Sequence, residues 1–210
     1  MNDYLNNCLE SGQKCQKYIV DYSAGIPAGS LFETRCAELT TCVDEFEDLA
    51  GQAMAAGAEA MEQTDVKSSE REDLIAVMNR NLNAASAAEP DFPGTQDRYY
   101  FRRNLSNENL LAAGRSHAQG GTTDGPLLIS YGAPAAWVAD TTAAADAFEA
   151  SFATQDSAQI SRVALNAQLK AKNDRLGQLK RTVGFFVKLY FENDIGAQTA
   201  WKSAAHVKRP

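Results

Sequence analysis

The sequence lacks most of the patterns that mark catalytic or metal-binding proteins. Its 210 residues include only two histidines, His117 and His206, so a Ser-His or Cys-His catalytic pair would have to use one of them. The Glu-x-x-His pair of di-iron bundles is absent, as are the Walker loop, the dinucleotide-binding glycine fingerprint and the Gly-x-Ser-x-Gly elbow. The sequence therefore predicts no catalytic residue, no cofactor and no metal. Whether the chain is an enzyme stays open, with a non-enzymatic protein favoured.

Cysteines are few and widely spaced. Cys8 and Cys15 are seven residues apart and Cys36 and Cys42 are six apart, whereas zinc fingers and ribbons need pairs two to four residues apart. Cys8, Cys15 and Cys36 also fall at apolar positions of amphipathic segments, where a thiol behaves as a small hydrophobic group. The pattern favours buried core thiols. A disulfide between the first two helices, and metal or redox chemistry, are the alternatives.

Strand formers and long apolar runs are also scarce. Alanine is abundant while β-branched and aromatic residues are scarce, which favours helix over strand. No apolar run approaches the ~20 residues that cross a bilayer. The polar start Met1-Asn2-Asp3-Tyr4 lacks the basic and apolar regions of a signal peptide. We therefore expect a cytoplasmic protein that is not embedded in a membrane.

The charge is acidic overall and unevenly distributed. The chain carries 27 acidic and 20 basic residues, a net charge of −7. Residues 1–105 contain 18 acidic and 9 basic side chains, and residues 106–210 contain 9 acidic and 11 basic ones. Because an acidic protein repels phosphates on average, no nucleic-acid or membrane partner is expected. The asymmetry fits two halves of one domain that attract each other, or head-to-tail association between molecules.

Helical periodicity is the main pattern that the sequence does contain. Proline, glycine and capping residues separate the periodic segments. Residues 90–105 are the predicted long loop. Helices are predicted over residues 4–22, from Ser30 to about Met61, from Ser68 or Ser69 to a point before Pro90, from Ser106 to Gly120-Gly121, from Trp137 through Phe152, over Leu176–Tyr190, and in a final turn with Trp201, Ala204 and His206.

The predicted helices fall into two halves of similar layout. Gly25-Ile26-Pro27-Ala28 precedes a long helix in the first half, and Gly132-Ala133-Pro134-Ala135 does so in the second. Residues 4–89 and 106–206 would then form an internal pseudo-repeat of two helical hairpins, neither of which can bury its apolar stripe alone. We expect an all-α fold, an antiparallel helical bundle built from two hairpins within a single domain over residues 1–210.

The loop contains the residues best suited to an interaction. Arg98-Tyr99-Tyr100-Phe101-Arg102-Arg103 places three aromatic residues among three arginines, types that are enriched at interface hot spots. Arginine also binds carboxylate and phosphate groups. The alternative is that the aromatic rings close the end of the bundle. An acidic stretch at residues 44–48 is interpreted as a solvated helix face, and a basic stretch at residues 170–188 as a solvated face or a partner surface.

Two motif regions stand out in the second half of the chain. One reads Phe101-Arg102-Arg103-Asn104 and then Leu110-Leu111-Ala112-Ala113-Gly114-Arg115, and the other is the tail Trp201–Arg209. They resemble the F-R-x-P-R-N, L-L-A-A-x-R and W-x-S-A-x-H-V-x-R motifs of a family of uncharacterised all-helical bacterial proteins of similar length. The proline of the first motif is missing here, since Arg103 directly follows Arg102. The resemblance implies an all-helical fold and carries no information about chemistry.

Two functions are compatible with these observations. The first is a non-enzymatic structural or interaction protein that associates with itself or with another protein. The alternative is a helical bundle that binds a small anionic ligand in an arginine-rich pocket formed by Arg102, Arg103, Arg115 and His206. The candidate residues for either function are Tyr99, Tyr100, Phe101, Arg102, Arg103, Arg115, Trp201 and His206.

Overall fold

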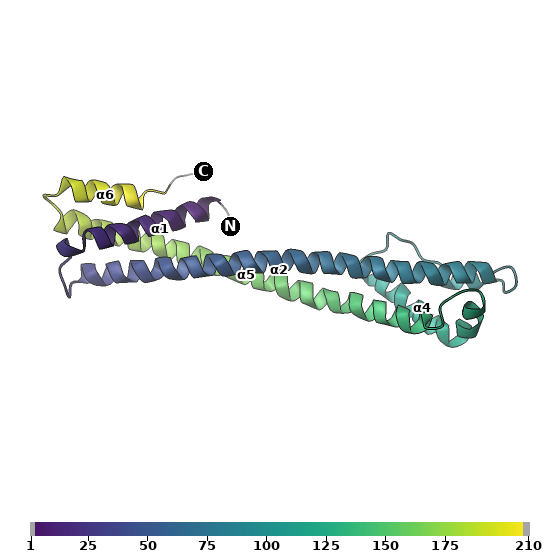
Figure 1. Ribbon diagram of the computed structural model, residues 1–210. Helices are drawn as coiled ribbons and strands as arrows, with labels where there is room; N and C mark the ends of the chain where they lie inside the picture. The colour runs from purple at the N-terminus through teal and green to yellow at the C-terminus, as the bar shows by residue number, and fades with distance from the viewer. Residues whose placement is uncertain (1–2, 208–210) are drawn as a thin grey trace. The chain divides into compact units, whose positions relative to one another are not determined.

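The protein is built from helices joined by short connections (Figure 1). The structure, a computed structural model, describes residues 3–207, and none of them forms a β-strand. The predicted all-α class is therefore confirmed. The elements are α1 (Asp3–Asp21), the 3-10 helix η1 (Ser23–Gly25), α2 (Leu31–Ala88), α3 (Thr95–Tyr99), α4 (Asn107–Ser130), α5 (Trp137–Tyr190) and α6 (Ile195–Ala205).

The chain forms two compact units, and the two longest helices contribute to both. Unit 1 consists of the residues up to Ala58 and those from Ile160 on, and unit 2 consists of Glu59–Gln159. Unit 1 therefore contains α1, the first part of α2, the last part of α5, and α6. Each unit draws on both halves of the chain, so the units do not coincide with the predicted repeat of residues 4–89 and 106–206.

The structure corrects the prediction of separate helices within α2 and within α5. The expected break between Met61 and Ser68 does not occur, and α2 is one helix of 58 residues. No proline interrupts this segment, and an isolated glycine such as Gly57 costs only about 1 kcal/mol in a helix. The segment between Phe152 and Leu176 likewise continues as part of the 54-residue α5. Ser30 does cap the start of α2, accepting a hydrogen bond from the Glu33 amide at 3.1 Å.

The prediction that Gly120-Gly121 ends the fourth helix is also wrong, because α4 continues to Ser130. The two glycines instead let neighbouring side chains approach the helix closely. A Cβ atom at Gly120 would lie 2.5 Å from the Tyr99 hydroxyl oxygen, and one at Gly121 would overlap Val138. Here glycine serves tight packing rather than helix termination. The predicted loop of residues 90–105 is present, with the short helix α3 inside it.

Helices α2 and α5 are antiparallel partners within each unit. In unit 1, Glu38 accepts a hydrogen bond from Arg175, and Glu45 accepts one from Lys172. In unit 2, Asn81 donates to the Thr141 hydroxyl at 2.8 Å. As the α2 position rises from 38 to 45 to 81, the position of its α5 partner falls from 175 to 172 to 141. The two helices therefore run antiparallel.

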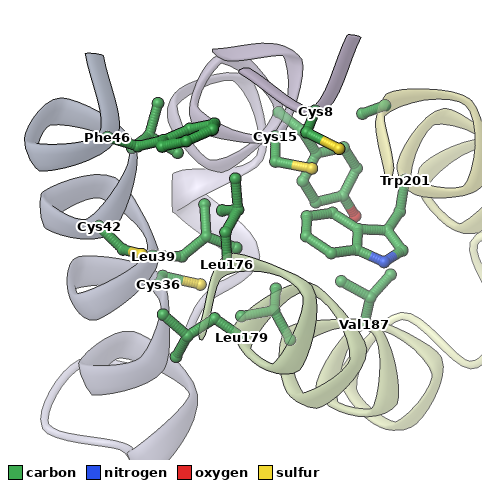
Figure 2. Close-up of a cluster of buried hydrophobic side chains, with 14 of the residues drawn as sticks. Cys8, Cys15, Cys36, Leu39, Cys42, Phe46, Leu176, Leu179, Val187 and Trp201 are labelled. Carbon is green, nitrogen blue, oxygen red and sulfur yellow. The ribbon is translucent and has the colours of Figure 1, made fainter. Parts of the chain in front are cut away.

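The core of unit 1 is made by α1, α2, α5 and α6, as Figure 2 shows. Leu39, Phe46 and Leu176 are fully buried in it. All four cysteines are free thiols that lie buried in this core, so the core-thiol prediction is confirmed. Burial raises the pKa of Cys15 and of Cys36 to about 12. The thiols of Cys15 and Cys36 therefore stay protonated at neutral pH, the form in which cysteine packs as a hydrophobic group.

Unit 2 has its own core, formed by α2, α4, the start of α5 and the loop around α3. Leu74, Met78, Leu110 and Phe148 are fully buried in one part of it, and Tyr99, Leu128 and Trp137 are almost fully buried in another. The two parts together enclose the polar residue His117.

We expect Leu176→Ala to lower the free energy of unfolding of unit 1 by about 2–5 kcal/mol, because it removes a fully buried side chain and leaves a cavity. Leu189→Ala on the same helix is the matched control, since Leu189 is 66% exposed and its loss should cost less than about 0.5 kcal/mol. Urea unfolding followed by circular dichroism measures both. Equal midpoints for the two variants would contradict this description of the core.

The buried thiols predict very slow labelling in the native protein. A disulfide reagent such as DTNB should react with the folded chain at least about a hundredfold more slowly than with the chain in guanidinium, because it needs an accessible thiolate. In guanidinium without reductant, all four thiols should react. Rapid labelling of the native protein, or fewer than four reactive thiols after unfolding, would argue against the four free core thiols.

Candidate functional site

The segment Arg98–Arg103, which contains three aromatic residues and three arginines, is divided between the core and the surface of unit 2. Tyr99 and Phe101 are buried, so these two rings serve the core, as the alternative interpretation of the loop predicted. Tyr100 is 64% exposed, and Arg102 and Arg103 are exposed beside it. Arg98 is also exposed but forms an ion pair with Asp124, so Tyr100, Arg102 and Arg103 are the residues of the segment best placed for an interaction.

The other candidate residues do not join this loop within either unit. Arg115 of unit 2 forms ion pairs with Asp146 and Glu149 of α5, at 2.5 and 2.7 Å. Trp201 and His206 belong to unit 1, where Trp201 is buried and His206 is an exposed residue that follows α6. Neither unit by itself therefore contains the predicted pocket of Arg102, Arg103, Arg115 and His206. Lys208 and Arg209 of the tail motif lie outside the described residues.

His117 is a buried residue of unit 2. It lies inside α4, with 2% of its surface exposed, against the rings of Tyr99 and Phe101. Its ring hydrogen-bonds to the backbone of Tyr99, and its Nδ1 has no partner among the described residues. Burial lowers the pKa of His117 from about 6.5 to about 4. The imidazole is therefore neutral at physiological pH.

A groove of unit 1 lies between α5 and α6. It encloses about 420 Å³, a size typical of small-ligand and side-chain pockets. Its floor is apolar and aromatic, and its other lining residues include four cations. The lining residues are Gly177, Lys180, Arg181, Gly184, Phe185, Lys188, Trp201, Lys202, Ala205 and Val207. We refer to this feature as the basic groove.

The helix pair that forms the basic groove is shaped by two glycines of α5. A Cβ atom at Gly184 would lie 2.8 Å from Nε1 of Trp201, so glycine is needed where α6 packs closely against α5. Gly177, two turns earlier, has no neighbour within 4 Å of a Cβ position and leaves the groove open. Phe185 is 69% exposed, and Lys188 lies over its ring with the Nζ atom 5.9 Å from the ring centroid. The groove therefore presents an aromatic surface beside positive charge.

The four cations of the basic groove are not neutralised by carboxylates. Among residues 3–207, no ion pair involves Lys180, Arg181, Lys188 or Lys202. Elsewhere on α5, Lys172 and Arg175 do have such partners, Glu45 and Glu38, at 2.6 and 3.0 Å. Uncompensated positive charge is thus concentrated where the groove is.

Lys180 is the most unusual of these cations because it is 8% exposed. Its Nζ donates to the Ser11 hydroxyl at 2.9 Å, and that hydroxyl donates to the Ala204 carbonyl at 2.9 Å. This chain of hydrogen bonds connects α5, α1 and α6. Burial lowers the pKa of Lys180, an effect that a nearby anion would oppose.

A second cavity of about 420 Å³ adjoins the basic groove and shares Gly177, Lys180, Arg181 and Val207 with it. Its remaining lining is polar, including Asn173, Asp174 and Gln178, with Tyr4 and Cys8 of α1. Lys180 and Arg181 therefore lie between an apolar cavity and a polar one. A bound anion at these two residues could carry an apolar part on one side and a polar part on the other.

Sequence reasoning recognised part of this site and missed part. Lys180, Arg181 and Lys188 belong to the basic stretch that was interpreted as a solvated or partner face. Phe185 and Lys202 were not singled out. Gly177 and Gly184 lie seven residues apart on a strongly periodic helix. This spacing puts both glycines on one side of the helix, and it could have indicated that this side is open or closely packed. Phe185 also falls outside the apolar stripe of Leu176, Leu179 and Val183.

Within the described chain, no group of three or more His, Cys, Asp or Glu side chains could hold a metal ion. None of the helices over residues 3–207 is both long and apolar enough to cross a bilayer.

Comparison with protein-family models, with curated proteins and with solved structures finds no match to this chain. The resemblance of its motifs to a family of uncharacterised bacterial proteins therefore stays a prediction. The site is interpreted on its own geometry.

His117 makes the stability of unit 2 depend on pH. Its folded pKa is lower than its unfolded pKa, so the stability from its neutral form is fully present above about pH 6.5 and is lost as the pH falls towards 4. The loss is about 1.4 kcal/mol per pH unit, roughly 3 kcal/mol in all. His117→Asn should flatten the slope of unfolding free energy against pH over this range.

The measurement uses urea unfolding between pH 7 and 4, read from Trp137 of unit 2 in a Trp201→Phe background. His206→Asn is the control, because His206 is exposed and should leave the slope unchanged. An equal slope in His117→Asn and in the parent would show that His117 is not the group responsible.

Proposed function

We propose that this protein is a non-enzymatic interaction protein whose basic groove binds an acidic, partly apolar segment of a protein partner. The observation that carries the proposal is the combination, in one groove, of an exposed aromatic surface and four cations that have no carboxylate partner among residues 3–207. Anionic groups would satisfy the cations, and burial of Phe185 would supply hydrophobic free energy.

An amphipathic acidic helix fits this groove better than a nucleic acid or a lipid surface does. Helix-in-groove recognition uses apolar anchors on one face of the bound helix, flanked by charges that set its register. Phe185 and Leu189, four residues apart and 69% and 66% exposed, supply a matching apolar ridge on α5. The net charge of −7 for the chain disfavours polyanions that need a large basic surface.

The test is a titration with a fluorescein-labelled helical peptide of repeated Leu-Glu-Glu-Ala units, followed by fluorescence anisotropy. We expect saturable binding that weakens with salt. Lys188→Ala combined with Lys202→Ala should reduce the affinity about five- to thirtyfold, from roughly 0.5–1 kcal/mol for each lost pair. Phe185→Ala should weaken binding without changing the salt dependence, since it removes apolar contact only.

The matched control is Lys170→Ala, which removes an exposed cation of α5 outside the groove and should leave the affinity within twofold. A Leu-Lys-Lys-Ala peptide should not bind. Equal weakening by Lys170→Ala and by the groove variants would indicate non-specific charge attraction and would overturn the proposal.

A small anionic ligand is the second candidate, and the paired cavities around Lys180 and Arg181 favour it. Together they offer an apolar and a polar compartment on either side of two cations. This candidate site differs from the arginine-rich pocket predicted from the sequence, since three of its four cations are lysines. Dodecanoate would probe this alternative: saturable binding by calorimetry, lost in Lys188→Ala with Lys202→Ala, supports it, and no heat of binding counts against it.

A further inference from the structure

The chain that has the basic groove also has a strongly acidic unit. Unit 2 carries 15 acidic and 7 basic side chains, a net charge of −8. The segments that form unit 1 carry 12 acidic and 13 basic side chains, a net charge of +1. Each molecule therefore contains both a cationic groove and a large excess of negative charge, in different units.

The negative charge of unit 2 includes an exposed face of α2. Its buried face is formed by Ala60, Leu74 and Met78. The outward face places four exposed carboxylates and an exposed methionine within about three helical turns. These residues are Met61, Glu62, Asp65, Glu72 and Asp73. We call this feature the acidic face.

The acidic face has the composition that the basic groove requires. Met61 is 70% exposed, although a methionine side chain gains free energy from burial. Among the residues that the structure describes, none of Glu62, Asp65, Glu72 and Asp73 forms an ion pair. An apolar side chain and uncompensated anions thus occur together on this helix, as do Phe185 and uncompensated cations on α5.

The charges of the two surfaces also repeat at the same interval. Asp65 and Glu72 are seven residues apart on α2, and Arg181 and Lys188 are seven residues apart on α5. Seven residues span about 10.5 Å of an α-helix and almost two turns, so each pair lies on one side of its helix. Two helices that cross at a shallow angle can therefore pair both charges at once, whichever way they run.

We propose that the occupant of the basic groove is the acidic face of a second copy of this chain. The inference rests on the proposed function, because it takes the groove as the binding site and names its partner. The contact joins unlike surfaces, unit 1 of one molecule and unit 2 of the next, and is heterologous. A bound pair still has one free groove, on one copy, and one free acidic face, on the other, so association continues head to tail.

The experiment is a charge exchange between the two surfaces in the full-length chain. One variant reverses the groove, Arg181→Glu with Lys188→Glu, and the other reverses the acidic face, Asp65→Lys with Glu72→Lys. All four side chains are exposed or lie at the groove, so both variants should keep the circular dichroism spectrum of the parent. Sedimentation velocity from 1 µM to 1 mM, at low and at high salt, measures association.

We expect the parent to associate in a concentration-dependent way at low salt and to dissociate in high salt. Each variant alone should be at least tenfold weaker in association, because its groove and its acidic face then carry like charges. A mixture of the two variants should recover association, since opposite charges again face each other. The control, Asp97→Lys with Glu108→Lys, makes the same charge change elsewhere in unit 2 and should associate at least as strongly as the parent.

The outcomes separate this inference from the proposed function. A parent that stays monomeric at 1 mM in low salt overturns the second-copy inference, as does a mixture of variants that stays monomeric while the parent associates. If the Leu-Glu-Glu-Ala peptide still binds in either case, the groove is a site for a different acidic protein. If the peptide also fails to bind, the proposed function fails with it.

Discussion

The antiparallel packing of α2 against α5 is the constraint on which the rest of this structure depends. Both helices take part in both units, so neither unit can form its core without them. Their shared surface is apolar where α1 and α6 or α4 complete a core, and polar pairs such as Asn81 with Thr141 occur between the apolar contacts. The shorter helices then bury the apolar faces that two helices alone would leave exposed.

This arrangement determines where positive charge collects. The acidic first part of α2 neutralises two cations of α5, Lys172 and Arg175, through Glu45 and Glu38. Beyond these pairs, α5 faces α6 and α1, which contribute no carboxylate to the groove. Lys180 is held there by a neutral hydroxyl, Ser11. A buried cation without an anion is costly to desolvate, and a bound anionic group would offset part of that cost.

Much of the secondary structure could be predicted from residue patterns, and the reasons for the failures are local. The α1 periodicity, the Ser30 cap and the turn after Gly132 lie where the sequence indicated. The predicted breaks inside α2 and α4 failed because Ser68, Gly120 and Gly121 permit a helix end without requiring one. The close approach of Tyr99 leaves no room for a side chain at Gly120, and Tyr99 is twenty-one positions away, outside any local pattern.

Composition and periodicity by themselves determined the all-helical class, the burial of the cysteines and the uneven charge. These properties follow from side-chain chemistry and from the 3.6-residue repeat, which depend on near neighbours in sequence. Only the tertiary structure decided which charges are neutralised and which aromatic rings are exposed. Tyr99 and Tyr100 are adjacent and chemically identical, yet one is buried and the other exposed. Lys172 and Lys188 lie on one helix, yet within the described part of the chain only Lys172 pairs with a carboxylate, because ion pairing depends on distances between distant parts of the chain.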